Sequence, residues 1–268
     1  MQLIKTLSTL KIIMRRIVYS IFTNKIDEHP SADNFKKDQF VKYKHKIIEA
    51  QSKYAKICNA SYKLFETTNT NYNEIQFEKL YLFDELANDY DEVLYLDFDV
   101  IPVKNSIIFD RFNLNSMCAC SINKHKEFIH KLNEVKNLTE MHMFIKTTSK
   151  KAMLSIHDIN GSDDLINTGV LLANKKVIKS IDLKNTLKEA SLTFNKSKDD
   201  NIYYEDITKL WIENNEAFFS YIIEKYNIPY TNIGILWNFI LNHKIKNVNP
   251  SAYFLHVISK EFEKCLEL

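Results

Sequence analysis

The chain has 268 residues, 45% of them hydrophobic, and a formal net charge of +2 at pH 7, so it can bury a sizeable core as one domain, 1–268. The nearly balanced charge gives no overall field that would attract nucleic acid or an anionic membrane. Only three glycines occur, Gly161, Gly169 and Gly234, which excludes a G-x-G-x-x-G dinucleotide motif and a Walker phosphate loop, so a bound diphosphate would have to be met by a metal and by side chains.

The first residues, 1–13, are apolar but carry Lys5 and Lys11 and are too short to span a bilayer. We expect a frayed extension here, with an interfacial anchor as the alternative. This predicts no transmembrane segment, at most a weak peripheral membrane contact, and a cytoplasmic location. The richness in Lys, Asn and Ile is typical of AT-rich coding, as in a viral protein or one from an AT-rich microbe.

The four cysteines show no zinc pattern, because Cys118 and Cys120 have one intervening residue where structural zinc pairs usually have two to four. Without a secretory signal, we expect reduced, buried thiols rather than disulfides. The cysteines concerned are Cys58, Cys118, Cys120 and Cys265.

Strands and helices alternate along the first hundred residues. This order predicts right-handed crossovers and a parallel core, with a ligand crevice at the carboxyl ends of the strands. The expected elements are a strand over 16–22, a helix over 35–60, a strand over 62–65, a helix over 77–88 and a strand over 93–102.

The strand over 93–102 carries two carboxylates, Asp97 and Asp99. Because side chains alternate across a strand, both should point the same way while Phe98 packs on the other face. Two hard oxygen ligands suit Mn²⁺ or Mg²⁺. This Asp-x-Asp after an aliphatic strand resembles the metal-binding motif of the GT-A glycosyltransferases, which use nucleotide-sugar donors.

Residues 116–122 are expected to form the next strand, and the segment that follows this strand has only weak helical periodicity. We interpret 123–155 as a variable insertion beside the active site, for acceptor selectivity or as a lid, with a surface helix pair as the equal alternative.

A second motif lies in the strand over 165–174. Its Asn167, Thr168 and Gly169 resemble the Asn-Thr/Ala-Gly strand of glycogenin-like and bacterial lipopolysaccharide galactosyltransferase-like enzymes. The resemblance implies that these residues meet the donor sugar. Alternatively, a glycine in a strand marks only a bulge or a close packing contact.

A polar helix start at 213–216 precedes an expected helix over 217–226, a strand-like 228–230 and a Trp-Asn segment at 236–239. By resemblance, Glu216 and Asn215 are the catalytic candidates near the anomeric carbon. The alternative is helix capping and dipole complementarity, and Trp237 is equally explained as core.

The last motif is an apolar strand within 253–260 that carries His256 and then Lys260. The resemblance implies that His256 is the third metal ligand and that Lys260 contacts the diphosphate. The family spacing between these two residues is longer and contains Gly, so Lys264 is an alternative.

Further donor-binding candidates lie upstream. Lys79 stands where the family has a nucleotide-contacting Arg or Lys, although a helical salt bridge with Glu78 or Glu85 would explain it equally. Thr23 and Asn24, at the end of the first strand, complete the expected set together with Asp97.

The motifs together imply an α/β fold, a single GT-A (Rossmann-like) domain with a mostly parallel central sheet flanked by helices. The implied activity is metal-dependent transfer of a sugar from a nucleotide-diphosphate donor, foremost a UDP-sugar, to a glycan or other hydroxyl acceptor, with Mn²⁺ or Mg²⁺ as cofactor. Retaining and inverting chemistry both stay open, with Glu216 as the base if the enzyme inverts.

The sequence leaves two alternatives to a glycosyltransferase open. In a haloacid-dehalogenase-type phosphatase, the first Asp of an Asp-x-Asp is a nucleophile, but that motif opens its domain and favours Thr or Val where this chain has Ile101. The other alternative is a catalytically inactive sugar-binding protein on the same fold.

Overall fold

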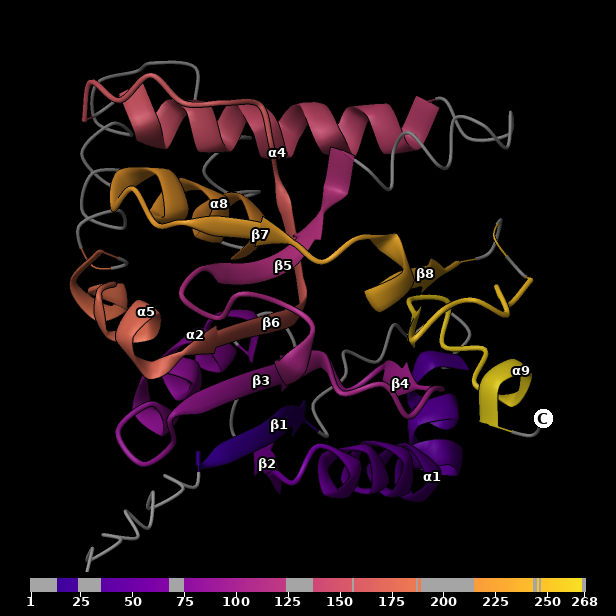
Figure 1. Cartoon of the computed structure of the whole chain (residues 1–268). Helices are drawn as coiled ribbons and strands as arrows, with labels where there is room; N and C mark the ends of the chain where they lie inside the picture. Colours follow the sequence, from indigo (N-terminus) through magenta and orange to yellow (C-terminus); the bar gives the residue numbers. More distant parts are fainter. Residues whose placement is uncertain are drawn as a thin grey trace, which may run out of the picture.

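The computed structural model describes residues 14–23, 35–67, 75–123, 137–155, 157–186, 188, 215–242, 245 and 247–266 (Figure 1). Within 137–155, side chains are described from Lys146 onward. Among these residues no helix is both long and apolar enough to cross a membrane.

A six-stranded central sheet organises the chain. Its strands are β1 (Arg16–Thr23), β2 (Ser61–Thr67), β3 (Glu92–Leu96), β5 (Met117–Ser121), β6 (Ile166–Asn174) and β7 (Tyr230–Asn232), in the order β2-β1-β3-β6-β5-β7. The order can be followed from bottom to top in Figure 1.

Strand direction in this sheet agrees with the predicted mostly parallel core. β1 pairs in parallel with both β2 and β3, and β5 pairs in parallel with β7. β6 alone runs the other way, antiparallel to β3 and β5. The two strand–helix–strand crossovers at the front of the chain produce the parallel part, as the alternating pattern predicts.

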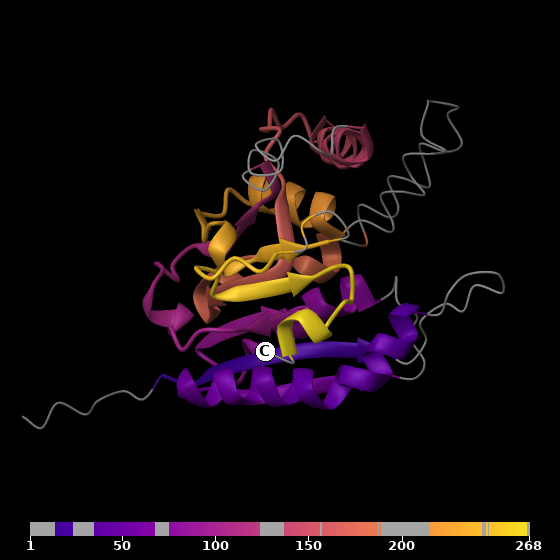
Figure 2. The ribbon, with the colours of Figure 1, turned by 90° about the vertical axis from the view of Figure 1, so that its right-hand side faces the viewer.

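A second sheet of three strands, β4 (Val100–Pro102), β9 (Phe254–Val257) and β8 (Phe239–Leu241), lies beside the first. β4 and β9 are antiparallel, with Val100 opposite His256. In Figure 2, β9 and α9, both in yellow, lie on the side of the molecule that faces the viewer. This sheet brings the C-terminal part of the chain against the segment that follows β3.

The prediction of one continuous strand over 93–102 is wrong. β3 ends at Leu96, and residues 97–99 form a turn in which the N–H of Val100 donates to the carbonyl of Asp97 at 2.9 Å. The chain then enters the other sheet as β4. Asp97 and Asp99 therefore converge through a turn and not through strand alternation. Phe98 is buried, as expected, against Phe22 and Phe40.

Helices cover both faces of the central sheet. Those in contact with its strands are α1 (Phe35–Ile57), α2 (Ile75–Leu86), α5 (Lys175–Lys179) and α8 (Asn215–Lys225). The described residues also form α4 (Asn137–Ser155), which packs on α8, the short α9 (Glu263–Leu266), and 3-10 turns at η1 (Ile108–Asp110) and η2 (Ile235–Trp237). The predicted helices over 35–60, 77–88 and 217–226 are thus found with ends shifted by a few residues.

The helix α1 ends at Ile57 and not at residue 60 as predicted, for a local reason. Asn59 adopts a left-handed conformation (φ +51°), and the N–H of Ala60 donates back to the carbonyl of Ala55 at 2.9 Å. A left-handed residue just after the last turn satisfies terminal carbonyls and stops a helix, so α1 ends at Ile57.

Alternating strand residues divide the core into two faces. Tyr19 and Tyr95 pack with Phe83 of α2 and Phe218 of α8 on one face. Val18 and Leu94 pack on the other with a group that includes Tyr54, Trp237 and Phe254. Trp237 is thus a core residue, stacked on Tyr253 with ring centroids 4.1 Å apart.

The segment 123–155 contains one long helix among its described residues, α4, which packs on α8 at the top of Figure 1. Lys146 and Lys150 of α4 pair with Glu216 and Glu224 of α8. Residues 124–136 lie outside the described part, so the role of the segment stays a prediction.

Cys58, Cys118 and Cys120 are buried, Cys265 is half-buried, and none of the four forms a disulfide among the described residues. This agrees with the predicted reduced thiols.

Candidate functional site

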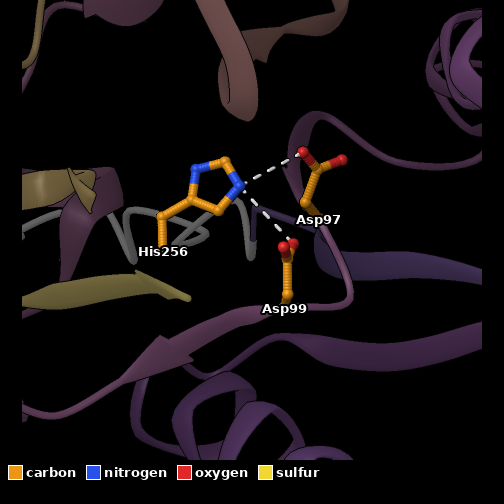
Figure 3. A group of neighbouring side chains, drawn as sticks. All are labelled: Asp97, Asp99 and His256. Carbon is orange, nitrogen blue, oxygen red and sulfur yellow. Dashed lines mark ion pairs between the residues drawn. The ribbon is translucent and has the colours of Figure 1, made fainter. Parts of the chain in front are cut away.

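Two carboxylates and an imidazole meet where β3 ends. Asp97 and Asp99 lie in the turn between β3 and β4, and His256 projects from β9 (Figure 3). The Nε2 atom of His256 is 3.4 Å from an oxygen of Asp99 and 3.7 Å from an oxygen of Asp97. One ligand atom from each residue lies within 4.8 Å of the other two.

This donor set fits a hard or borderline divalent cation. Carboxylate oxygens suit Mg²⁺ and Mn²⁺, and imidazole is a further nitrogen ligand that first-row metals accept. Ligands at ~2.1 Å from one ion in neighbouring octahedral positions lie about 3 Å apart. The two separations between Nε2 and the carboxylates, 3.4 and 3.7 Å, are slightly wider than this, so the three side chains fit one ion.

Asp97 is held by two neighbours. The hydroxyl of Tyr95 donates to its Oδ1 at 2.5 Å, and the ammonium of Lys79 lies 3.1 Å from the same oxygen. Lys79 is 1% exposed and also donates to the carbonyl of Thr168 at 3.3 Å. The ion pair made by Lys79 is therefore with Asp97, not with Glu78 or Glu85, and it directs the lysine into the site.

Asp99 is buried and forms an ion pair with Lys260. Burial by itself raises the pKa of Asp99, but the Lys260 ammonium and the His256 ring outweigh it and hold that pKa well below its ordinary value. The carboxylate is therefore ionised, as a metal ligand must be. Lys264, the alternative to Lys260, instead pairs with Glu261.

Lys260 has a left-handed backbone (φ +62°), a conformation that a residue with a Cβ adopts at a cost. Its backbone N–H donates to the carbonyl of Val257 at 3.0 Å, so the lysine closes a tight turn directly after β9.

A row of hydrogen bonds runs from His256 to α8. The Nδ1 of His256 lies 2.9 Å from Oδ1 of Asn238, whose Nδ2 donates to Oδ1 of Asn167 at 2.7 Å. The Nδ2 of Asn167 donates to Glu216 at 2.6 Å. Glu216 also pairs with Lys146. The metal-ligand candidates and the predicted catalytic carboxylate are thus joined through two amide side chains.

Gly169 is required by the close approach of His256. A Cβ at this position would lie 2.4 Å from Cε1 and 2.8 Å from Nδ1 of the histidine ring. The carbonyl of Gly169 also accepts the N–H of Asp97 at 2.8 Å. The glycine of the predicted motif therefore marks a close contact, which is one of the two readings that the sequence leaves open.

Gln51 of α1 was not predicted, yet it fixes the metal-site turn. Its Nε2 donates to the carbonyls of Asp97 at 3.2 Å and Val100 at 2.9 Å. The hydroxyls of Ser20 and Tyr62 donate to its Oε1. The available signal was an amide within the apolar stripe of the helix.

Asn215 and Glu216 both lie in the first turn of α8, and only Glu216 joins the hydrogen-bonded row. Asn215 is buried and donates to the carbonyl and side-chain oxygens of Gln76, at the start of α2. Glu216 and Asn215 thus hold α8 to β6 and α2 in this structure, and contact with a sugar stays a prediction for both.

A pocket opens beside Asp97 and Asp99. Thr23, at the end of β1, lies in its wall, while Asn24 is outside the described residues. The pocket is lined by Ile21, Phe22, Thr23, Phe40, Ile75, Gln76, Tyr95, Asp97, Phe98, Asp99 and Lys260. Its lining combines apolar side chains with the charged groups of Asp97, Asp99 and Lys260.

No family model matches the sequence, and no curated protein matches it. Solved structures do. One is a glycosyltransferase involved in the glycosylation of the major capsid of PBCV-1, at 16% identity and a TM-score of 0.49, covering 95% of this chain and 100% of that one.

Two further similar structures are also glycosyltransferases. Mouse xyloside xylosyltransferase 1 has 11% identity and a TM-score of 0.44, with 92% of this chain and 98% of that one covered. The galactosyltransferase LgtC, bound to donor and acceptor sugar analogs, has 13% identity and a TM-score of 0.44, with 91% and 87% covered. At 11–16% identity and TM-scores below 0.5, these likenesses assign neither a family nor an activity to this chain, and its chemistry has to be argued from its own side chains.

Proposed function

We propose that this chain is a metal-dependent glycosyltransferase that moves a sugar from a nucleotide-diphosphate donor, foremost a UDP-sugar, to a hydroxyl group of a glycan or other acceptor. The observation that carries the proposal is the convergence of Asp97, Asp99 and His256 beside a pocket that Lys260 also lines. The carboxylates and the imidazole suit a divalent cation, and the ammonium suits the diphosphate that such a cation would hold.

Asp97, Asp99 and Nε2 of His256 would hold Mn²⁺ or Mg²⁺. When bound, the ion supplies positive charge that stabilises the nucleotide diphosphate as it leaves the sugar. Tyr95 and Lys79 hold the Asp97 carboxylate in place, and Gln51 holds the backbone turn. The site is thus preorganised by groups that need not move during the reaction.

Lys260 supplies the second positive charge. Its ammonium pairs with Asp99 and the residue lines the pocket, so it would meet the phosphate oxygens of a donor bound there. An ammonium is a suitable point charge for phosphate oxygens. We infer that Lys260 binds the diphosphate while Asp99 holds the cation.

Glu216 is the candidate on the sugar side. One oxygen of its carboxylate accepts a hydrogen bond from Asn167 and the other pairs with Lys146. Both oxygens are therefore engaged, and neither is left to take a proton from the acceptor hydroxyl. This favours an electrostatic or positioning role over that of a general base. It is consistent with retaining chemistry, in which the leaving phosphate takes the proton of the acceptor.

The phosphatase alternative is less compatible with the geometry. A nucleophilic aspartate needs an oxygen free to attack phosphorus. One oxygen of Asp97 accepts from Tyr95 and Lys79, and the other faces His256.

Release of nucleoside diphosphate from a panel of UDP- and GDP-sugars tests the proposal. We expect turnover with at least one donor that depends on Mn²⁺ or Mg²⁺, is abolished by EDTA, and is lost in Asp99→Asn. Asp84→Asn is the matched control, because Asp84 pairs with Lys179 on the surface. Metal-independent phosphate release, unchanged in Asp99→Asn, would contradict the proposal.

A further inference from the structure

Asn238 lies between η2 and β8 and is completely buried (0% exposed). Its neighbours in the chain, Trp237 and Phe239, are core residues. A polar amide at such a position costs free energy unless its hydrogen bonds are made. Both polar atoms of the Asn238 amide make a hydrogen bond, one with His256 and the other with Asn167.

The orientation of both amides is fixed by groups at the ends of the row. The N–H of Gly169 donates to Oδ1 of Asn167 at 2.9 Å, and a backbone N–H can only donate. The other end of the Asn167 amide meets the Glu216 carboxylate at 2.6 Å, which accepts, so that end must be the nitrogen. Both amide assignments of Asn167 are therefore determined.

Asn238 then has one allowed orientation. Because Oδ1 of Asn167 is an acceptor, the atom of Asn238 that lies 2.7 Å from it must be the donating Nδ2. The remaining atom, Oδ1, faces Nδ1 of His256 at 2.9 Å. An amide oxygen accepts only, so Nδ1 of His256 carries a proton.

A proton on Nδ1 leaves Nε2 as the metal-ligating nitrogen, and Nε2 is the atom that faces Asp97 and Asp99. Which ring nitrogen binds a metal is set by the hydrogen bond that the other makes. The fully buried amide thus selects both the ring orientation and the tautomer that a cation needs.

We propose that Asn238 is a positioning residue. It fixes His256 as the Nδ1–H tautomer and, through Asn167, ties the histidine to Glu216 on α8. The metal side of this inference rests on the proposed function, whereas the tautomer does not. Asn167, expected to meet the donor sugar, has its amide engaged within the row, so it acts as the link between the two halves of the site.

The direct test measures the ring nitrogens of His256 by ¹⁵N NMR in the full chain. The signal is identified by its absence from His256→Gln. In wild type with EDTA we expect a proton on Nδ1, and the same proton after saturation with diamagnetic Mg²⁺. A neutral ring with its proton on Nε2 in wild type would overturn the proposal, whatever the chain does with nucleotide sugars.

Mn²⁺ affinity, measured calorimetrically without a donor, gives the second readout. Asn238→Leu keeps the volume and removes both hydrogen bonds, and we expect Mn²⁺ binding to weaken ~10–100-fold, the usual effect of losing the outer partner of a metal-bound histidine. Asn238→Asp loses the donor to Oδ1 of Asn167 but keeps the acceptor for Nδ1, so it should retain the Nδ1–H tautomer and most of the affinity.

Asn232→Ala is the matched control. Asn232 accepts hydrogen bonds from the N–H groups of Ser121 and Gly234, so its loss should reduce thermal stability without changing Mn²⁺ affinity.

Wild-type Mn²⁺ affinity and the wild-type tautomer in a folded Asn238→Leu would overturn the proposal. If that variant does not fold, Asn238→Asp decides, because loss of the Nδ1 proton there is equally contradictory. Absence of Mn²⁺ binding in wild type would refute the proposed function and leave the NMR test standing.

Discussion

Gly169 and His256 are in direct contact across the two sheets, and the histidine ring occupies the space that a Cβ at residue 169 would fill. The contact brings the strand that carries Asn167 against the strand that carries the imidazole. It also explains why this chain, with three glycines in all, has one in the middle of a buried strand.

Gly169→Ala should displace the His256 ring and weaken metal binding. A contact of 2.4 Å cannot be accommodated without movement of one of the two backbones or of the ring, and overpacking of this kind costs about 1–3 kcal/mol. We expect a reduced melting temperature and an Mn²⁺ affinity lowered by at least about tenfold, since a metal ligand has moved.

Gly161→Ala is an informative comparison, because its Cβ would meet the side chains of Glu224 and Leu154, away from the metal site. It should lower stability while leaving Mn²⁺ affinity unchanged. Wild-type Mn²⁺ affinity in Gly169→Ala would show that the ring position does not matter for the metal.

Lys260→Met should destabilise the chain in a pH-dependent manner. The Lys260–Asp99 pair is buried, and removal of one partner of a buried pair costs about 3–5 kcal/mol. The folded-state pKa of Asp99 is lowered, so the stability that the pair contributes is fully present above the unfolded pKa of an aspartate, about 3.9, and is lost as pH falls.

Urea unfolding in EDTA at several pH values checks this. The difference in unfolding free energy between wild type and Lys260→Met should be largest near neutral pH and shrink as the pH drops below about 4. A difference that stays constant with pH would mean that the ammonium does not control the ionisation of Asp99.

Gln51→Leu should loosen the turn at residues 97–100. The substitution leaves the carbonyls of Asp97 and Val100 without their amide donor, and an unsatisfied buried polar group costs about 1–3 kcal/mol. We expect a loss of about 2–4 kcal/mol in unfolding free energy together with weaker Mn²⁺ binding.

Ser52→Ala, at the next position of α1, serves as the control for substitution in this helix. If Gln51→Leu lost stability but kept full Mn²⁺ affinity, Gln51 would support the fold without positioning the aspartates.

The cysteine thiols should react slowly in the folded protein. Burial raises the pKa of Cys118 to about 11 and that of Cys120 to about 12, and the thiolate is the reactive form. With iodoacetamide at pH 8, mass spectrometry should detect little modification of either residue until the chain is unfolded in denaturant. Rapid alkylation of both under native conditions would contradict their burial.

Much of the fold could be predicted because strand and helix periods are local. The buried run at β1 and the apolar stripe of α1 give the front of the sheet directly. Asp97 and Asp99 could be predicted as a pair from their spacing at the end of an apolar strand, whereas His256, on a strand of the other sheet, came from the resemblance alone.

The sheet switch after Leu96 could not be predicted, because Val93–Pro102 reads as one apolar strand and only the pairing with β9 decides where it divides. Gln51 and Asn238 were missed for a related reason. Each is a polar residue in an apolar segment, and its purpose depends on partners far away in the chain. Lys79 was placed at the site, but its pairing with Asp97 follows from burial that sequence spacing does not reveal.

The central claim is that Asp97, Asp99 and His256 bind a divalent cation together with a nucleotide diphosphate. Anomalous scattering from a crystal grown with Mn²⁺ and UDP tests it most directly. We expect one manganese peak ~2.0–2.3 Å from a carboxylate oxygen of each aspartate and from Nε2 of His256, with diphosphate oxygens completing the coordination and Lys260 next to them. Manganese bound elsewhere, or UDP bound with the three side chains unligated, would contradict it.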